Sequence, residues 1–438
     1  MSLDSATTPS SSSTRPAASA RRYDLDWLRI FAFGLLILYH VGMYYVSWDW
    51  HVKSPFASTT LEPLMMLSSP WRLALLFFVS GCATAFLHAK SAAGFVRSRN
   101  LRLLVPLALG FWVIVPPQSW AEVSEAVGYK DGYLHFLALY ATAYPGFCRA
   151  TCLRLPTWNH LWFVGYLWCY TMIAAAAWRF SPPQFLARLG AACARRLRGA
   201  WLIAAPTLWL ALIRVALVGR FPETHALTDD WYVHALYFSV FALGLLLARE
   251  GAVWDEITRQ RWTALALALA SYAVVATYFS HYGDAHVPPD WVRQGQRVVY
   301  ALNQWSAIVA ALGFARRWNP ADSRARRYLT EAVFPFYIVH QTAIVLLAHA
   351  LKPLALRPVL EGPLLIAATV ATCLASFEIV RRVGWLRPLF GLAPRATAAP
   401  IRPSPSTSTS TSTSTSTSAC ASTPTPAAQA GRPAPCPR

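Results

Sequence analysis

One histidine and one arginine share the first long apolar run of the chain. His40 ends the run FAFGLLILYH, and Arg29 stands eleven residues before it. A helix turns about 100° per residue, so this spacing puts both side chains on nearly one face, roughly 16 Å apart along the axis. An imidazole at this depth can act as a general base, while an arginine at the mouth can attract an anion.

Three arginines, Arg97, Arg99 and Arg102, stand at the start of a later apolar run. A spacing of three places Arg99 and Arg102 on one helix face, where two guanidiniums suit bidentate binding of phosphate. Alternatively, these arginines can be the ordinary positive charges found at the cytoplasmic ends of membrane spans, with no role in phosphate binding. His40 has a structural alternative too, because an imidazole can simply hydrogen-bond a neighbouring helix.

Other polar residues also fall in or beside apolar runs. Asn159 and His160 open WNHLWFVGYLW, and Glu331 and His340 belong to the run EAVFPFYIVHQ. Ionisable groups are costly inside a bilayer and usually mark a site or a pathway. Each one alone is most simply a paired structural group, but together they exceed what a purely structural bundle needs.

One spacing resembles a catalytic motif of glycerolipid acyltransferases. His225 and Asp230 have the H-x-x-x-x-D spacing, but they fall in a short loop expected on the outer side, away from cytoplasmic acyl donors. We interpret the match as chance. The sequence has no G-x-S-x-G, P-loop or G-x-G-x-x-G motif, and no Cys or His spacing typical of a metal site.

These residues must be positioned by membrane helices. The chain of 438 residues is 55% hydrophobic and only 13% charged, and its apolar residues gather in runs long enough to cross a bilayer as helix. This predicts an all-α, polytopic bundle of about ten transmembrane helices. The expected spans lie near residues 27–46, 70–89, 103–119, 160–180, 201–219, 231–249, 262–280, 298–315, 333–350 and 363–381.

Arginine predicts the orientation of the bundle. Arginines gather before the first span and after every even-numbered one, whereas the other loops carry few basic residues and several acids. The positive-inside rule then places the N- and C-termini in the cytoplasm. The net charge of +19 does not predict nucleic-acid binding, because no basic face is interleaved with stacking aromatics.

The rest of the sequence predicts two disordered tails and contains two cysteines in one loop. Residues 1–21 and 391–438 are rich in Ser, Thr and Pro and are expected to be disordered tails around a membrane domain at 22–390. Cys148 and Cys152 share one loop, where either a disulfide or two unpaired thiols is possible.

An ordered set of motifs resembles the acyltransferase 3 family of integral membrane acyltransferases. YDLDWLRIFAFGLLILYH resembles the family's opening, LLFFVSGCATAF its second-helix motif, and RNLRLLVPL its R-x-x-R entry to the third helix. HLWFVGYLW and FPFYIVHQ are similar to its later motifs, so the resemblance spans about 22–385. Within the family, the last two motifs are most similar to glucan biosynthesis protein C, which is associated with succinylation of glucans.

The resemblance implies an O-acyltransferase of the bacterial inner membrane. It implies transfer of an acetyl or succinyl group from cytoplasmic acyl-CoA to a hydroxyl of a glycan or other carbohydrate, directly or through an acyl-histidine. His40 is then the catalytic base, Arg29 stabilises negative charge, and Asp26 orients Arg29. The roles implied for the rest are coenzyme A binding by Arg97, Arg99 and Arg102, an acceptor-side position for His160 and Asn159, and support of the pocket by Glu331 and His340.

A proton-coupled transporter or flippase is the main alternative, since buried histidines also suit proton-coupled transport. Transporters of that kind often show paired interrupted helices in two repeats, and no internal repeat is evident. If the chain is an acyltransferase, we expect His40, Arg99 and Arg102 to meet in one cavity open to the cytoplasm. The sequence leaves the oligomeric state open.

Overall fold

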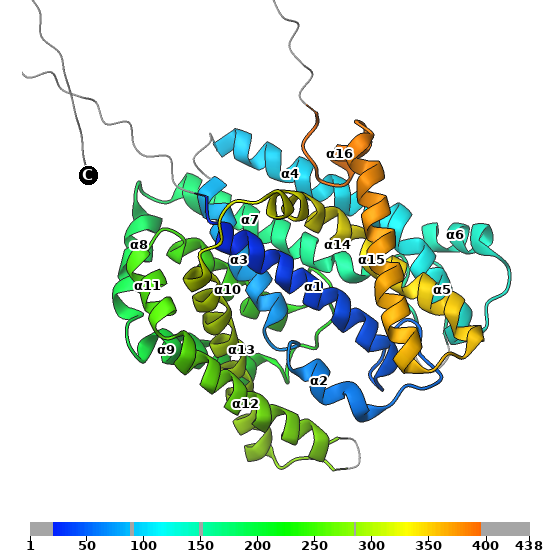
Figure 1. Ribbon diagram of the computed structural model, residues 1–438, viewed down its shortest axis with the longest axis horizontal. Coiled ribbons are helices and arrows are strands. Elements are labelled where there is room, and N and C mark those ends of the chain that lie inside the picture. The colour runs from blue at the N-terminus through cyan, green and yellow to red at the C-terminus, as the bar shows by residue number, and fades with distance from the viewer. Residues whose placement is uncertain (1–20, 88–91, 149–151, 284–285, 396–438) are drawn as a thin grey trace, which may run out of the picture. The chain divides into compact units, whose positions relative to one another are not determined.

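The computed structural model describes residues 21–87, 92–148, 152–283 and 286–395 (Figure 1). Helices are the only regular elements longer than an isolated bridge within these ranges, which confirms the all-α prediction. The expected N-terminal tail and nearly all of the expected C-terminal tail lie outside the described residues.

The helices follow one another in chain order. They are α1 (Tyr23–Tyr45), η1 (Thr59–Leu61), α2 (Glu62–Met66), α3 (Arg72–Leu87), α4 (Ala92–Leu109), η2 (Gly110–Ile114), α5 (Val115–Val127), α6 (Tyr133–Ala141), η3 (Asn159–Leu161), α7 (Trp162–Phe180), α8 (Phe185–Arg196), α9 (Trp201–Leu217), α10 (Trp231–Leu247), α11 (Gly251–Arg259), α12 (Arg261–His281), α13 (Asp290–Trp318), α14 (Arg324–Leu351), η4 (Lys352–Leu354), α15 (Pro358–Arg382) and α16 (Leu386–Leu389).

Each predicted span overlaps one of these helices. Within the described ranges, seven helical stretches are long and apolar enough to cross a membrane, or up to nine if each of two bent pairs is one span. The bent pairs are α8 with α9, at 111°, and α10 with α11, at 114°. α3 is apolar but shorter. The protein is therefore a multi-pass helical bundle, while the count of ten and the cytoplasmic termini stay predictions.

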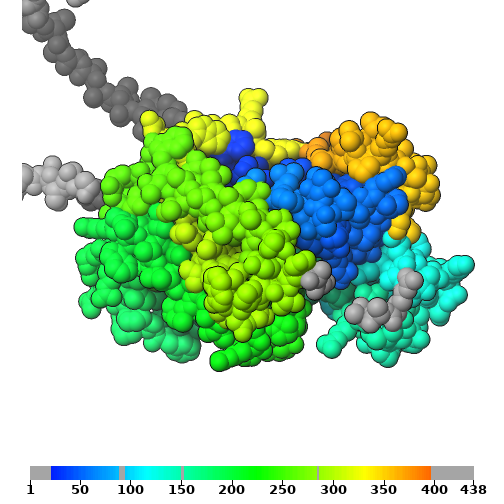
Figure 2. Space-filling view, turned by 90° about the horizontal axis from the view of Figure 1, so that it is seen from below, coloured from blue at the N-terminus to red at the C-terminus, as the bar shows by residue number. Residues whose placement is uncertain are grey.

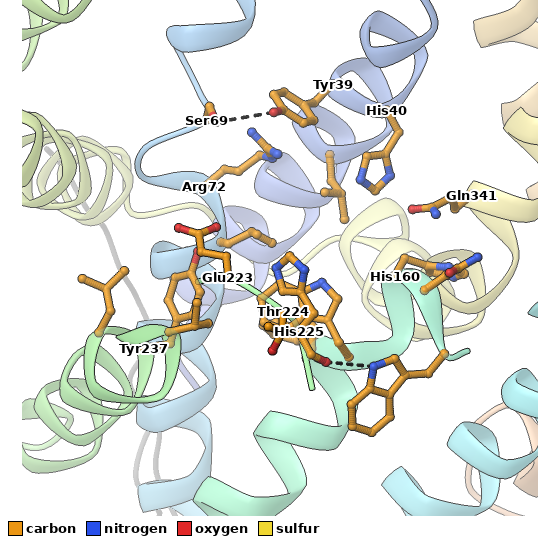
Figure 3. A pocket seen from close by; sticks show the side chains of 18 of the residues that line it. Tyr39, His40, Ser69, Arg72, His160, Glu223, Thr224, His225, Tyr237 and Gln341 are labelled. Atoms are coloured by element: carbon orange, nitrogen blue, oxygen red, sulfur yellow. Dashed lines mark hydrogen bonds between the residues drawn. The ribbon is translucent and has the colours of Figure 1, made fainter. Parts of the chain in front are cut away.

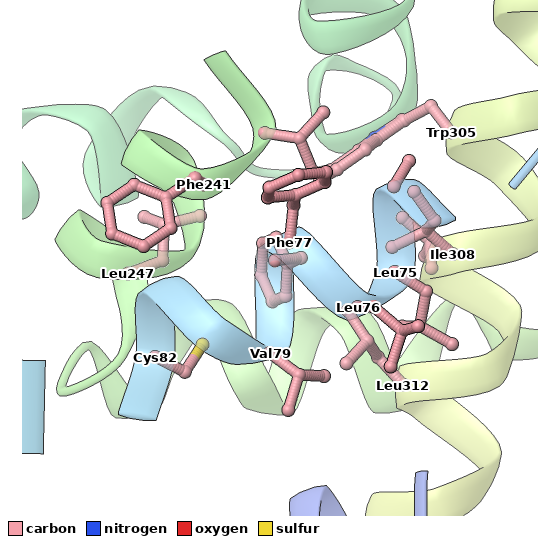
Figure 4. Packing of buried hydrophobic residues seen from close by; sticks show 14 of the residues in the cluster. Leu75, Leu76, Phe77, Val79, Cys82, Phe241, Leu247, Trp305, Ile308 and Leu312 are labelled. Carbon is pink, nitrogen blue, oxygen red and sulfur yellow. The ribbon is translucent and has the colours of Figure 1, made fainter. Parts of the chain in front are cut away.

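Two apolar clusters hold the bundle together. One is centred on α3, α10 and α13 and includes Phe77, Phe241 and Trp305 (Figure 4), and Phe78 packs edge-on against Trp305. The other joins α1, α5, α14 and α15. α3 and α10 approach so closely that a Cβ at Gly81 or Gly244 would overlap the facing helix backbone. This contact fixes the second half of α3 against α10 within the first cluster.

Charged contacts bring the start of α1, the start of α14 and the end of α15 to one end of the bundle. Arg326 of α14 donates to Asp26 of α1, and Arg387, which follows α15, donates to Glu331 of α14 at 3.0 Å. We call this the inner end, because the predicted orientation places it in the cytoplasm. The opposite end is called the outer end.

Loops close the outer end. The segment 46–70, in blue, lies between α12 and the region of α6 when the molecule is seen from below (Figure 2). Lys53 holds this segment by donating to the carbonyl oxygens of Met43 and Trp48 at 2.7 and 2.8 Å, at the C-terminal end of α1. In a neighbouring loop, Cys148 and Cys152 form a disulfide, which resolves the pairing that the sequence left open.

The third predicted span is part of a longer, irregular helical stretch. α4, η2 and α5 run together over Gly94–Val127, with Pro106 in α4 and a π-turn at η2. Such turns are rare and are often found at functional sites. Gly110 begins this turn, and a Cβ there would overlap the side chain of Leu161. The turn therefore packs directly against η3, which carries His160.

Candidate functional site

Three histidines from three different elements meet in the middle of the bundle. His40 of α1 lies with its Nδ1 3.0 Å from the Nε2 of His340 in α14, and the two rings stack with centroids 5.1 Å apart. The ring of His160 from η3 lies edge-on to His340, also at 5.1 Å. The predicted residues His40, His160 and His340 thus form one cluster.

Backbone carbonyls fix the proton positions on this cluster. The Nδ1 of His340 lies 2.7 Å from the carbonyl oxygen of Tyr337, and a carbonyl can only accept, so this Nδ1 carries the proton. The Nε2 of neutral His340 is then an acceptor, and the Nδ1 of His40 donates to it. The Nε2 of His40 is left with its lone pair free. That is the tautomer required of a general base.

His160 has the opposite tautomer to His40, with its proton on Nε2. Its Nε2 lies 3.1 Å from the carbonyl oxygen of Ile338 and must donate, while the hydroxyl of Tyr337 donates to the carbonyl of His160 itself. The lone pair is therefore on Nδ1, which is buried and has no partner among the described residues. His160 thus offers an unused acceptor for a hydroxyl group.

The histidines border a cavity of about 460 Å³ at the outer end, which we call the outer cavity. Figure 3 shows His40, His160 and Gln341 on one side of it and Arg72 and Glu223 on the other. The loops that close the outer end contribute much of its wall. Aromatic and polar side chains alternate around it, among them Trp50, Trp158, Asn159, Trp162, His225 and Tyr237.

A second cavity, of about 170 Å³, lies toward the inner end and contains the predicted arginines. Arg29 of α1 lines it together with Arg99 and Arg102 of α4. None of the three forms an ion pair with a carboxylate in the described part of the chain. Arg97 is exposed and does not line this inner cavity. The i, i+3 spacing predicted that Arg99 and Arg102 share a face, whereas Arg97, which was assigned to coenzyme A binding with them, lies outside this cavity.

The expected single cavity is wrong, because His40 and the arginines line two separate cavities. Phe163 and Tyr337 line both, with their ring centroids 5.9 Å apart. They form an aromatic partition between the inner arginines and the outer histidines. The spacing of Arg29 and His40 puts both on one face of α1. They are far enough apart along the helix axis that they lie on opposite sides of the partition.

Two predicted positions differ from the structure. Asp26 does not hydrogen-bond Arg29, because its carboxylate accepts from Arg21 at 3.0 Å and from Arg326. Glu331 lines neither cavity and instead pairs with Arg387 at the inner end. Both acids sit at positions where helix ends meet, and Arg326 and Arg387 are far from them in the sequence. Local spacing could not reveal those partners.

A hydrogen-bonded chain beside the outer cavity was not predicted. Glu122 accepts from the Nδ1 of His51 at 2.6 Å, and the amide of Gln341 donates to the Nε2 of His51 at 2.8 Å. Gln341 ends the run FPFYIVHQ next to His340, which is the one local signal for it. The chain fixes the Gln341 amide at the cavity wall. His51 lies in a loop, where a lone histidine gives no pattern to follow.

The H-x-x-x-x-D spacing does not form a catalytic pair. The carboxylate of Asp230 accepts from the hydroxyl of Tyr166 at 2.7 Å and from the backbone N–H of His225 at 3.1 Å, so the imidazole is not its partner. His225 nevertheless lines the outer cavity, stacked on Trp162 with centroids 4.3 Å apart. Burial lowers the pKa of His225, and Asp230 opposes that shift.

Comparison with known proteins identifies the family. Residues 22–378 match the acyltransferase 3 family, described as an acyltransferase domain. The chain belongs to this family. No curated protein and no solved structure matches the chain significantly. As an acyltransferase 3 protein it is a multi-pass membrane acyltransferase, and the match ends within α15, just before the arginine pair that closes that helix.

Proposed function

We propose that this acyltransferase 3 protein transfers an acyl group from acyl-CoA in the inner cavity to a hydroxyl of a carbohydrate in the outer cavity. The single observation that carries the proposal is the oriented His40–His340 pair, which leaves a free imidazole lone pair on His40, a residue that lines the outer cavity. The proposal joins the family's acyl chemistry to that geometry.

The inner cavity suits the donor. Arg29, Arg99 and Arg102 gather three guanidiniums at its wall without a carboxylate partner, and arginine binds phosphate groups through its forked donors. Acyl-CoA carries several phosphates and is made in the cytoplasm, on the side where the positive-inside rule places these residues. Arg29 therefore acts in donor binding, because the partition separates it from His40.

The outer cavity suits a sugar. Trp158, Trp162 and Tyr237 provide apolar ring faces, while Asn159, His160 and Gln341 provide hydrogen-bonding groups between them. Sugars present hydroxyls at their edges and C–H groups on their faces, so an aromatic wall with interspersed polar groups matches them. The unused Nδ1 acceptor of His160 fits a hydroxyl donor.

The chemistry follows from the tautomer of His40. Its Nε2 accepts the hydroxyl proton as the hydroxyl oxygen attacks the thioester carbonyl carbon. The C–S bond then breaks, the ester forms, and the imidazolium returns the proton to the thiolate of coenzyme A. His340 stabilises the imidazolium by accepting from its Nδ1–H. An acyl-histidine on the same Nε2 is the alternative route.

The finer assignment rests on the motifs. HLWFVGYLW and FPFYIVHQ are similar to glucan biosynthesis protein C, which favours a succinyl or acetyl donor, a glucan acceptor and the bacterial inner membrane. Proton-coupled transport remains the second candidate, because two cavities that meet at an aromatic partition also suit alternating access.

The test is an acyl-transfer assay on the full chain in lipid nanodiscs. Radiolabelled acetyl-CoA or succinyl-CoA is supplied with a glucan oligosaccharide, and His40→Ala is compared with the wild type. General-base loss should lower the rate about 10²- to 10⁴-fold. His135→Ala, at an exposed histidine that lines neither cavity, is the matched control and should keep the wild-type rate. Equal rates for His40→Ala and wild type would exclude this mechanism.

A further inference from the structure

The outer cavity has a second polar end, across from His160 and Gln341, whose two arginines form no ion pair within the described ranges. Arg72, the first residue of α3, is only 3% exposed, and its Nε and Nη1 find no hydrogen-bond partner in the part of the chain that the structure describes. Its guanidinium lies over the ring of Tyr39, with Cζ 3.3 Å from the centroid. Arg214 of α9 lines the same cavity, and its Nε is also buried without a partner.

One amide holds the two arginines in a common frame. Gln304 of α13 accepts from the Nη2 of Arg214 at 3.4 Å and donates to the carbonyl of Pro70 at 2.7 Å, two residues before Arg72. The ring of Tyr300 lies 4.1 Å from the Cζ of Arg214. The two guanidiniums are therefore positioned by contacts with neutral groups, and Nε and Nη1 of Arg72 and Nε of Arg214 have no hydrogen-bond partner among the described residues.

Charge is unbalanced at this end of the cavity. Across the described ranges, no carboxylate comes within ion-pair distance of Arg72 or Arg214. Among the described residues, Glu223 is the one acid that lines the outer cavity, so the two arginines share one carboxylate there; Figure 3 shows Arg72 and Glu223 on the same side. A buried unpaired cation is strongly unfavourable in a membrane protein and is retained for a function.

We propose that Arg72 and Arg214 form an anion subsite that binds a carboxylate or phosphate group of a substrate in the outer cavity. Planar guanidiniums with unused N–H donors match the oxygens of these groups. The ring of Tyr39 lies 6.1 Å from that of His40, so the Arg72 guanidinium is within about 10 Å of the imidazole. An anion held there belongs to the molecule that reacts at His40. That last step rests on the proposed function.

Binding is tested first, without any transfer reaction. Thermal unfolding of the full chain in nanodiscs is measured with sodium succinate, with sodium phosphate, and with sodium chloride at matched ionic strength. Succinate or phosphate at about ten times its Kd should raise the wild-type Tm by about 1–2 °C more than chloride does. Arg72→Gln and Arg214→Gln should lose this shift. Arg220→Gln, at an exposed arginine that does not line the cavity, should keep it.

The outcomes decide the proposal even if one variant does not fold. If Arg72→Gln is unstable, Arg214→Gln decides alone. No anion-specific shift in the wild type, or an equal shift in Arg214→Gln and Arg220→Gln, would overturn the anion subsite.

A second assay identifies which substrate carries the anion. Succinyl-CoA and butyryl-CoA share a four-carbon acyl chain and differ by the distal carboxylate, and each is paired with a neutral glucan or with the same glucan bearing phosphate. If the acyl group carries the anion, Arg72→Gln should lower succinyl transfer about tenfold more than butyryl transfer. If the acceptor carries it, the variant should lower transfer to the phosphorylated glucan more, with either donor. A uniform loss over all four pairs contradicts the subsite.

The two proposals fail in different ways. An anion-specific shift that depends on Arg72 and Arg214, with no transfer from any donor by the wild type, would support the subsite and contradict the proposed acyl transfer. Transfer that depends on His40, with no anion-specific shift in Tm, would support the proposed acyl transfer and contradict the anion subsite.

Discussion

At the scale of single residues, the proton positions in the histidine cluster decide what His40 can do. The carbonyl oxygen of Tyr337 fixes the proton on His340, and His340 in turn fixes the proton on His40. Each step is forced by an atom that can only accept. His340 is therefore a positioning residue, because it acts through His40 and does not itself face the reacting atoms.

His340→Leu should lower kcat about 10- to 100-fold while changing the KM for the donor little, because His40 loses the acceptor that holds its tautomer. His340→Gln should recover part of the rate, since an amide oxygen can accept from the same Nδ1–H. Steady-state kinetics on both variants check this. The positional role is contradicted if the two variants are equally slow, or if KM alone changes.

Glu223 makes the stability of the fold depend on pH. Although the residue is exposed, desolvation by the surrounding protein raises the pKa of its carboxyl, with Arg214 opposing the shift and Asp230 adding to it. The folded state then binds this proton more tightly than the unfolded chain, so the stabilisation is present at low pH and is lost as pH rises through the raised pKa.

Glu223→Gln removes that titration. Between about pH 4.5 and 7, its Tm should therefore fall less than that of the wild type, and the difference should stop growing above the raised pKa. Thermal unfolding in nanodiscs over this pH range measures the effect. Parallel Tm curves for the two proteins would show that Glu223 titrates as it does in the unfolded chain.

At the scale of elements, the three arginines of α4 differ in whether they line the inner cavity. Arg99 and Arg102 line the inner cavity, while Arg97 is exposed outside it. Arg99→Ala and Arg102→Ala should each raise the KM for acyl-CoA about tenfold, because each removes a charge-assisted contact to phosphate, and should leave kcat nearly unchanged. Arg97→Ala is the control on the same helix and should match the wild type. Equal effects at all three positions would indicate general surface charge instead of a donor site.

The packing of α3 on α10 depends on two glycines. A Cβ at Gly244 would overlap the carbonyl of Phe78, so Gly244→Ala must separate the helices or shift them. Overpacking of this kind costs roughly 1–3 kcal/mol. Gly34→Ala in α1 meets nothing within 4 Å and should be neutral or slightly stabilising. Thermal unfolding compares the two variants, and equal Tm values would contradict the close approach.

The sequence predicted the elements better than it predicted their partners. Length and hydropathy located the helices because each apolar run must satisfy its own backbone in a membrane. The spacing of Arg29 with His40, and of Arg99 with Arg102, correctly placed each pair on one helix face. Local spacing carries no information on contacts between distant segments. Asp26 was therefore assigned the wrong partner, and the aromatic partition at Phe163 and Tyr337 was missed.

The sequence analysis also missed cavity-lining residues that belong to no recognisable motif. Arg72 stands at the start of an apolar run, where arginine is ordinary, and only the structure shows that it is buried and unpaired. The loops that carry His51 and Glu223 have no periodicity from which the direction of these side chains could be predicted. They enter the site because the outer end of the bundle is closed by loops.

At the scale of the whole molecule, the bundle holds two cavities, one toward each end, that meet at an aromatic partition. The arginines lie on the inner side of the partition and His40 on the outer side. This arrangement is suited to a reaction whose donor and acceptor come from opposite sides of a membrane. In the proposed reaction the thioester end of the donor must then reach past Phe163 and Tyr337, while the phosphates of coenzyme A stay with the arginines on the inner side.

The most direct measurement uses sealed inverted vesicles that contain a glucan acceptor in the lumen. Radiolabelled acetyl-CoA or succinyl-CoA is added outside, on the cytoplasmic face, and label on the lumenal glucan is followed in wild type and in His40→Ala. The two-cavity account predicts lumenal label with the wild type and a loss of about 10²-fold or more with His40→Ala. Label that appears equally in both, or none on lumenal glucan with wild type while the glucan itself crosses the membrane, would contradict it.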